Sequence, residues 1–114
     1  MLIGRKTGYT NLSMDKARLE LEGDASITVI DVRTPDEYRA GHIPGSRNIP
    51  LNRIDEIEEV VPDHDAKLFV YCLSGARSAS ACAVLARMGY TNVVNIGGIA
   101  NWRGEIEASQ PVRS

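Results

Sequence analysis

The most informative part of the chain is residues 68–78, which read Leu68-Phe69-Val70-Tyr71-Cys72-Leu73-Ser74-Gly75-Ala76-Arg77-Ser78. The first five residues form an uninterrupted apolar run, which is typical of a strand buried on both faces of a parallel sheet. A polar loop containing a glycine follows this run. An alanine-rich helix is predicted next, from about residue 78 to residue 88, with Gly89 as its C-cap. This order of strand, loop and helix predicts an α/β fold.

The rest of the chain alternates strand-like and helix-like segments in the same way. Apolar and β-branched residues predict further strands at 9–12, 27–32, 47–49 and 93–96. Helices are predicted at 13–23, 34–41 and 54–61, with a short one containing Trp102 after the last strand. We therefore predict a single α/β domain of about five strands over residues 1–114, with its core at about 12–104 and a flexible tail at about 108–114.

The composition limits the classes of function that the chain can have. Its 114 residues are 43% hydrophobic and 25% charged, as in an ordinary globular protein. A formal net charge of −2 gives no basic field, so we expect no nucleic acid partner. No apolar run approaches the length of a membrane span, and residues 1–12 show no signal peptide. Two cysteines do not make a disulfide framework, and we expect a monomer in the reducing cytoplasm.

Cys72 is the candidate catalytic residue because of where the sequence places it. It ends a predicted strand, and ligands of parallel sheets bind at the carboxyl ends of the strands. The small residues of the following loop leave backbone N–H groups free to surround its sulfur, together with the N-terminus of the next helix. Both effects favour a thiolate, so the pKa of Cys72 is expected to lie below the free-thiol value of about 8.5.

Arg77 adds a positive charge at the far end of the loop. A guanidinium can bind an oxyanion through two hydrogen bonds, which suits a substrate with an anionic leaving group, such as thiosulfate losing sulfite. Cys72 would attack the outer sulfur, become a persulfide and pass the sulfur to a second nucleophile. The alternative interpretation of Arg77 is a solvated charge at the start of a helix.

Four groups of residues, taken together, resemble the rhodanese homology domain. They are Asp31-Val32-Arg33-Thr34-Pro35-Asp36-Glu37-Tyr38, Gly41-His42-Ile43-Pro44-Gly45 with Asn48, Cys72-x-x-Gly75-x-Arg77-Ser78, and Gly97-Gly98 with Trp102. The resemblance covers about residues 12–104. It implies a three-layer α/β/α fold with a five-stranded parallel sheet and a persulfide carried by Cys72. We expect no cofactor and no metal. The implied substrate-binding residues are Leu73, Ser74, Gly75, Ala76, Arg77 and Ser78.

The family signature also includes Asp31, Arg33 and His42, which we interpret as structural. Asp31 and Arg33 are candidates for contacting the substrate-binding residues without touching the substrate themselves. Arg33 either faces the crevice at the carboxyl ends of the strands, where Cys72 lies, or forms an ion pair with Asp31 or Glu37. His42 is expected to fix a turn by hydrogen bonding.

Three other residues that could carry chemistry are given structural interpretations. Cys82 lies inside the alanine-rich helix and is expected to be a small packing residue. His64 lies between two aspartates and is expected to be a solvated loop residue. Trp102 is expected in the core, although its segment could line the rim of a pocket. The cysteines and histidines have no metal-ligand spacing, so no zinc site is predicted.

Loop length separates the enzyme classes that the resemblance leaves open. Sulfurtransferases of this superfamily have a six-residue loop, as Cys72–Arg77 is here. Related phosphatases and arsenate reductases have one residue more and usually a histidine before the cysteine, where this chain has Tyr71. We therefore predict a sulfurtransferase that uses thiosulfate or a small persulfide and passes sulfur to cyanide, a thiol or an acceptor protein. The alternatives are a persulfide carrier that binds partner proteins and, less favoured, a phosphatase-like enzyme.

Overall fold

The computed structural model describes residues 8–109, and these form a five-stranded sheet with every strand parallel to its neighbours. The strand order is β1-β5-β4-β2-β3, which places β4 at the centre. The strands are β1 (Tyr9–Asn11), β2 (Thr28–Asp31), β3 (Arg47–Asn48), β4 (Leu68–Cys72) and β5 (Val93–Gly98). The predicted five-stranded parallel sheet is therefore confirmed.

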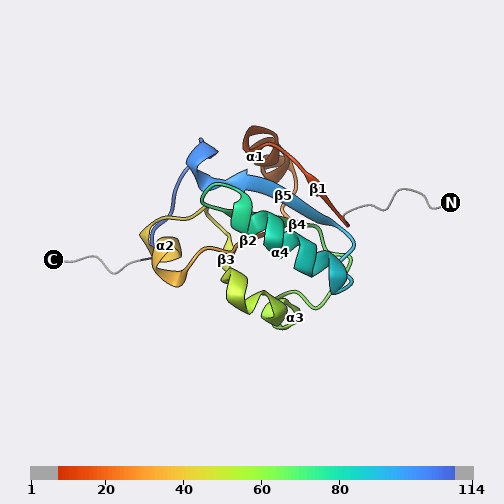
Figure 1. The fold of residues 1–114 in the computed structure, drawn as a ribbon. Coiled ribbons are helices and arrows are strands. Elements are labelled where there is room, and N and C mark those ends of the chain that lie inside the picture. The colour runs from red at the N-terminus through yellow and green to blue at the C-terminus, as the bar shows by residue number, and fades with distance from the viewer. Residues whose placement is uncertain (1–7, 110–114) are drawn as a thin grey trace.

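Helices cover both faces of this sheet (Figure 1). One face packs against α1 (Met14–Gly23), whose N-terminus is capped by Ser13 as predicted. The other face packs against α4 (Ala76–Arg87), together with the 3₁₀ helix η1 (Leu51–Glu56) and α3 (Ile57–Val60). The short helix α2 (Pro35–Ala40) lies near the carboxyl ends of the strands, and the 3₁₀ helix η2 (Ile99–Asn101) follows β5.

The central strand β4 divides its side chains between two apolar clusters, as a strand buried on both faces must. Leu68, Val70 and Cys72 contribute to the cluster beneath α4 and η1. Phe69 and Tyr71 contribute to the cluster beneath α1. All five residues are buried, and the alternation puts the side chain of Cys72 on the α4 side.

Some predicted boundaries were wrong. The helix α4 begins at Ala76, two residues earlier than expected, because Gly75 takes the N-cap position without a side-chain cap. The segment predicted as one helix over 54–61 instead contains the end of η1 and the helix α3, which meet where the backbone of Glu56 leaves the helical conformation. The 3₁₀ helix η1 already begins at Leu51 and has non-helical backbone inside it at Arg53. Trp102 lies just beyond η2 rather than inside a helix.

The structure describes only residues 108 and 109 of the predicted flexible tail, so its flexibility remains a prediction. Glu107 pairs with His42 in an isolated bridge, and the backbone N–H of Ser109 donates to the carbonyl of Arg39 at 3.0 Å. These bonds attach the chain to the end of α2 as far as residue 109. Residues 110–114 of the predicted tail, and most of the segment searched for a signal peptide, lie outside the described residues.

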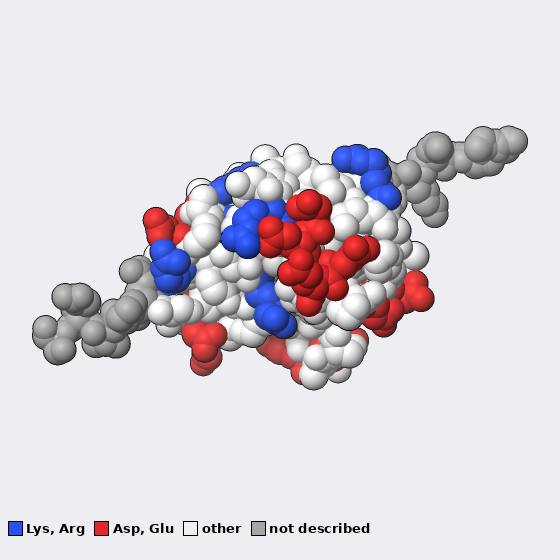
Figure 2. Space-filling view, turned by 90° about the horizontal axis from the view of Figure 1, so that it is seen from below, with Lys and Arg blue, Asp and Glu red and all other residues white. Residues whose placement is uncertain are grey.

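The surface offers no continuous basic patch on the face shown in Figure 2, where arginines and lysines are scattered and the acidic side chains form the larger group. This agrees with the formal net charge of −2. Among residues 8–109, no helix has the length and apolar character needed to cross a bilayer.

Candidate active site

The sulfur of Cys72 lies in a cradle formed by the turn between β4 and α4. The backbone N–H of Gly75 donates to Sγ at 3.0 Å, and only 1% of the surface of Cys72 is exposed. Gly75 adopts a left-handed conformation (φ +112°), which a residue with a side chain rarely takes. This conformation folds the loop back over Sγ and aims the N-terminus of α4 toward it, as the small loop residues predicted.

Ser78 completes the polar surroundings of the thiol from the first turn of α4. Its hydroxyl lies 3.5 Å from the Sγ of Cys72 and is fully buried. Burial raises the pKa of Cys72, but the hydrogen bond with the Ser78 side chain and those from the N–H groups of Ser78, Gly75 and Ser74 outweigh it. The net pKa of Cys72 is therefore lowered, in the direction that the sequence predicted.

Asn95 holds this serine in place and was not identified from the sequence. Its Oδ1 accepts hydrogen bonds from the hydroxyl of Ser78 at 2.8 Å and from the N–H of Gly97 at 3.0 Å. The signal that could have revealed it is a polar residue within the apolar strand 93–96. Asn95 thus connects β5 to Ser78, whose oxygen accepts the thiol proton of Cys72 in the structure. Because the hydroxyl has one proton, it must turn from Asn95 to the sulfur in order to donate to a Cys72 thiolate.

Gly98 of β5 lies in close contact with the backbone of the loop after β4. A Cβ atom at this position would clash with the carbonyl of Leu73 and would lie 2.6 Å from the Cα of Ser74. Only a glycine lets β5 approach the loop this closely. The Gly97-Gly98 pair is thus part of the architecture of the cradle.

Arg77 is bound to Glu37, which α2 brings to the loop. Its two guanidinium nitrogens donate to the two carboxylate oxygens at 2.9 and 3.1 Å. The hydrogen bond from Arg77 is the main cause that lowers the pKa of Glu37 to about 2, so the pair is ionised at neutral pH. The predicted binding of a substrate anion by Arg77 remains a prediction, and in the structure its guanidinium is occupied.

Comparisons with known proteins agree with this geometry. The family model of the rhodanese-like domain matches the sequence over residues 13–105. The chain belongs to the rhodanese-like family. The thiosulfate sulfurtransferase PspE of Escherichia coli (strain K12) is 45% identical over 61% of this chain and 68% of its own length. A solved rhodanese with anions from E. coli is 37% identical, with a TM-score of 0.69 over 72% of this chain and 98% of that one.

Another relative of this rhodanese-like chain is named as a sulfur carrier and not as a sulfurtransferase. The putative sulfur carrier protein YrkF of Bacillus subtilis (strain 168) is 30% identical over 84% of this chain. The chain spans about half of that relative's length (52%). The relatives thus include both thiosulfate sulfurtransferases and a putative carrier of sulfur.

Asp31 and Arg33 form a buried pair behind the rhodanese-like cradle. The Arg33 guanidinium donates to Asp31 Oδ2 at 2.7 Å and to the carbonyl of Gly41 at 2.7 Å, and it lies over the ring of Tyr71. The predicted ion pair with Asp31 is confirmed. The pair ties the end of β2 to the turn that follows α2, and both side chains are almost completely buried. A role of either residue in supporting the chemistry remains a prediction.

The two histidines and the second cysteine of this rhodanese-like chain have structural surroundings. His42 is buried, stacks on Tyr38 and makes a 2.7 Å hydrogen bond with the carbonyl of that residue, as expected of a residue that fixes a turn. His64 is half-buried rather than fully solvated, because it stacks on Tyr90. Cys82 is buried in the core, and burial raises the pKa of its thiol to about 12.

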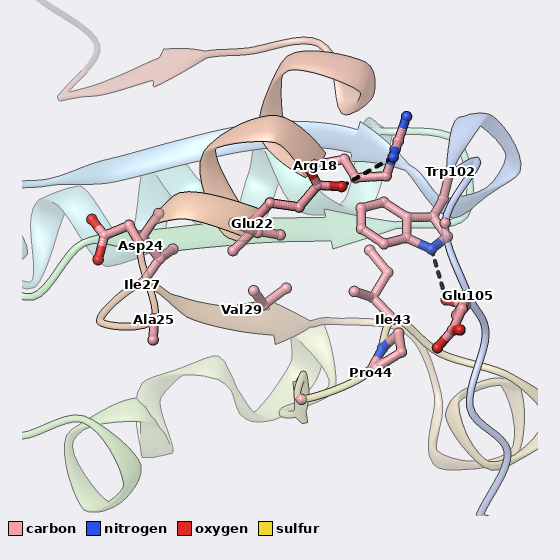
Figure 3. A pocket seen from close by; sticks show the side chains of 13 residues that line it. Arg18, Glu22, Asp24, Ala25, Ile27, Val29, Ile43, Pro44, Trp102 and Glu105 are labelled. Atoms are coloured by element: carbon pink, nitrogen blue, oxygen red, sulfur yellow. Dashed lines mark hydrogen bonds and ion pairs between the residues drawn. The ribbon is translucent and has the colours of Figure 1, made fainter.

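Trp102 lines a cavity of about 510 Å³ on the α1 side of the sheet (Figure 3). The indole lies beside Ile43 at one end of this cavity, with Asp24 and Ile27 at the other, and its Nε1 donates to the carbonyl of Glu105 at 2.8 Å. No residue of the Cys72 loop lines the cavity. Trp102 therefore packs at the edge of the core and borders a pocket that is separate from the cradle.

Proposed function

We propose that this chain is a sulfurtransferase that moves sulfane sulfur from thiosulfate or a small persulfide to a thiophilic acceptor through a persulfide on Cys72. The observation that carries the proposal is the cradle, in which Sγ accepts the N–H of Gly75 at 3.0 Å at the N-terminus of α4. A core cysteine without chemistry has no need of such donors. The relatives that are thiosulfate sulfurtransferases support the same activity.

The mechanism takes two displacement steps. In the first, the Cys72 thiolate attacks the outer sulfur of thiosulfate, a new S–S bond forms, and sulfite leaves with the electron pair of the broken S–S bond. In the second, an acceptor such as cyanide attacks the terminal sulfur of the persulfide, giving thiocyanate and the free thiolate. The N–H groups around Sγ are the donors available to stabilise the anionic sulfur between the two steps. The thiolate is already favoured, so no separate general base is needed.

A second candidate function is a persulfide carrier that receives and delivers sulfur by contact with partner proteins. The observation that favours it is Leu73, a large apolar side chain that stands 47% exposed on the loop itself. A protein partner could cover this side chain, whereas a small anion would leave it in water. The name of the putative sulfur carrier YrkF points in the same direction.

The test is a steady-state assay of thiocyanate formation from thiosulfate and cyanide. The sulfurtransferase proposal expects turnover that Cys72→Ser abolishes and Cys82→Ser retains. A carrier would take up sulfur from a protein persulfide on Cys72 but show negligible thiocyanate formation. Hydrolysis of para-nitrophenyl phosphate that depends on Cys72 would instead favour the phosphatase-like alternative. The reducing cytoplasm and the monomeric state remain predictions.

A further inference from the structure

The cradle has a single cationic side chain, and its charge is compensated. Within residues 72–78 only Arg77 is basic. Both of its donor nitrogens that face Glu37 are within 3.1 Å of the carboxylate, and the two side chains are about one-third exposed. A dianion entering the cradle would therefore meet an ion pair of no net charge instead of a free guanidinium.

The carboxylate of Glu37 is fixed independently of Arg77. Glu37 occupies the third position of α2 and forms a capping box with Thr34. Its Oε1 accepts the backbone N–H of Thr34 at 2.9 Å, while the backbone N–H of Glu37 donates to the Thr34 hydroxyl at 3.2 Å. The carboxylate thus stays beside the loop even when Arg77 moves, because the helix N-terminus holds it.

The other cation that lines the cavity beside Arg77 is also paired. A cavity of about 290 Å³ opens beside Arg77, and Arg33 is the other basic residue that lines it. Arg33 is buried and bound to Asp31, so its charge is compensated as well. The remaining walls of the cavity are largely apolar, including Val32, Pro50 and Leu51. Both cations that line this cavity are therefore already paired with a carboxylate, which leaves neither of them free to balance a second negative charge on a donor.

We propose that Glu37 is a specificity-determining residue, which lowers the preference of the cradle for the thiosulfate dianion and favours monoanionic organic donors of sulfane sulfur, such as thiosulfonates. The inference rests on the proposed sulfurtransferase function. With a thiosulfonate, the Cys72 thiolate attacks the terminal sulfur, the bond between the two sulfurs breaks, and an organic sulfinate leaves with its electrons. The enzyme product is the same persulfide, and only the charge of the donor differs.

The decisive variant is Glu37→Gln. Glutamine at the third position of a helix preserves a capping box, so this change removes the charge while retaining the cap. We measure kcat and KM for thiosulfate and for methanethiosulfonate, with cyanide as acceptor. The ratio of kcat/KM for thiosulfate to that for methanethiosulfonate should rise by up to about fivefold, the size expected from one partly exposed charge. The higher ratio should result mainly from a lower KM for thiosulfate, and the effect should shrink at high salt.

Two further variants separate charge from structure. Arg77→Gln leaves the carboxylate uncompensated and should lower the same ratio. The double variant Glu37→Gln/Arg77→Gln restores a neutral pair and should return the ratio close to that of the unsubstituted protein. The matched control is Glu22→Gln, which removes a carboxylate from the exposed pair with Arg18 on α1, across the sheet from α4.

An unchanged or lower ratio in Glu37→Gln would overturn the inference, as would a double variant that remains as low as Arg77→Gln. The latter result would make Arg77 a direct ligand of thiosulfate regardless of Glu37. A failure of the proposed sulfurtransferase function would give a distinct result. No donor would then add sulfur to Cys72 in an intact-mass measurement, and neither donor would give a kcat/KM value.

Discussion

The two cysteines of the chain differ in what surrounds their sulfur atoms. Cys72 accepts hydrogen bonds that lower its pKa, whereas burial raises the pKa of Cys82 to about 12. Iodoacetamide at neutral pH should therefore alkylate Cys72 in the folded protein and leave Cys82 unmodified, while both react after denaturation. Peptide mapping by mass spectrometry checks this. Faster labelling of Cys82 than of Cys72 would contradict the assigned environments.

Ser78 is the side chain that contributes most to lowering the pKa of Cys72. Removing its hydroxyl with Ser78→Ala should raise that pKa, because burial still disfavours the thiolate and one of the opposing hydrogen bonds is lost. The midpoint of the alkylation rate against pH should move to higher pH, with a several-fold slower reaction at neutral pH. Ser80→Ala, an exposed serine on the same helix, is the control. An unshifted midpoint in Ser78→Ala would contradict the role of the hydroxyl.

At the scale of elements, the cradle depends on the close approach of β5 to the loop after β4. Gly98→Ala should force these two backbones apart, because the new Cβ would overlap the carbonyl of Leu73. We expect a loss of stability of about 1–3 kcal/mol and a roughly tenfold or larger drop in sulfur transfer. Urea unfolding and the thiocyanate assay measure the two effects. Gly23→Ala, where a Cβ meets nothing within 4 Å, should be close to neutral.

The elements also show which features the sequence could predict. The capping box of Thr34 and Glu37 and the buried strand β4 were predictable because local hydrogen bonds and a local apolar run specify them. The start of α4 was missed by two residues because Gly75 provides its cap through backbone conformation alone. The pair of Arg77 with Glu37 joins positions 40 residues apart, so neither residue's neighbours indicate it. The fold and Cys72 were therefore accessible from the sequence, and the electrostatics of the loop required the structure.

At the scale of the whole molecule, the ion pair between α2 and the loop should make stability depend on pH. Glu37 has a folded-state pKa of about 2, below its ordinary value of 4.5. Its contribution is therefore present at neutral pH and is lost as the pH falls from about 4.5 toward 2. Because the pair is partly exposed, we expect that contribution to be about 1 kcal/mol or less.

The measurement is the difference in unfolding free energy between the unsubstituted protein and Glu37→Gln, determined in urea from pH 7 down to pH 3. The difference should shrink as the pH falls. A difference that stays constant, or grows, would show that the carboxylate of Glu37 does not gain its stabilising effect from ionisation. Glu22→Gln, in the exposed pair with Arg18, should change stability little at pH 7.

The central claim is that Cys72 carries a transferable sulfur, and intact-mass spectrometry tests it most directly. After incubation with excess thiosulfate, or with methanethiosulfonate, the protein should gain the mass of one sulfur atom, and cyanide should remove it. Cys72→Ser should show no gain, while Cys82→Ser should behave like the unsubstituted protein. No added sulfur from these donors, from glutathione persulfide or from a protein persulfide would contradict the sulfurtransferase function, as would a gain that persists in Cys72→Ser.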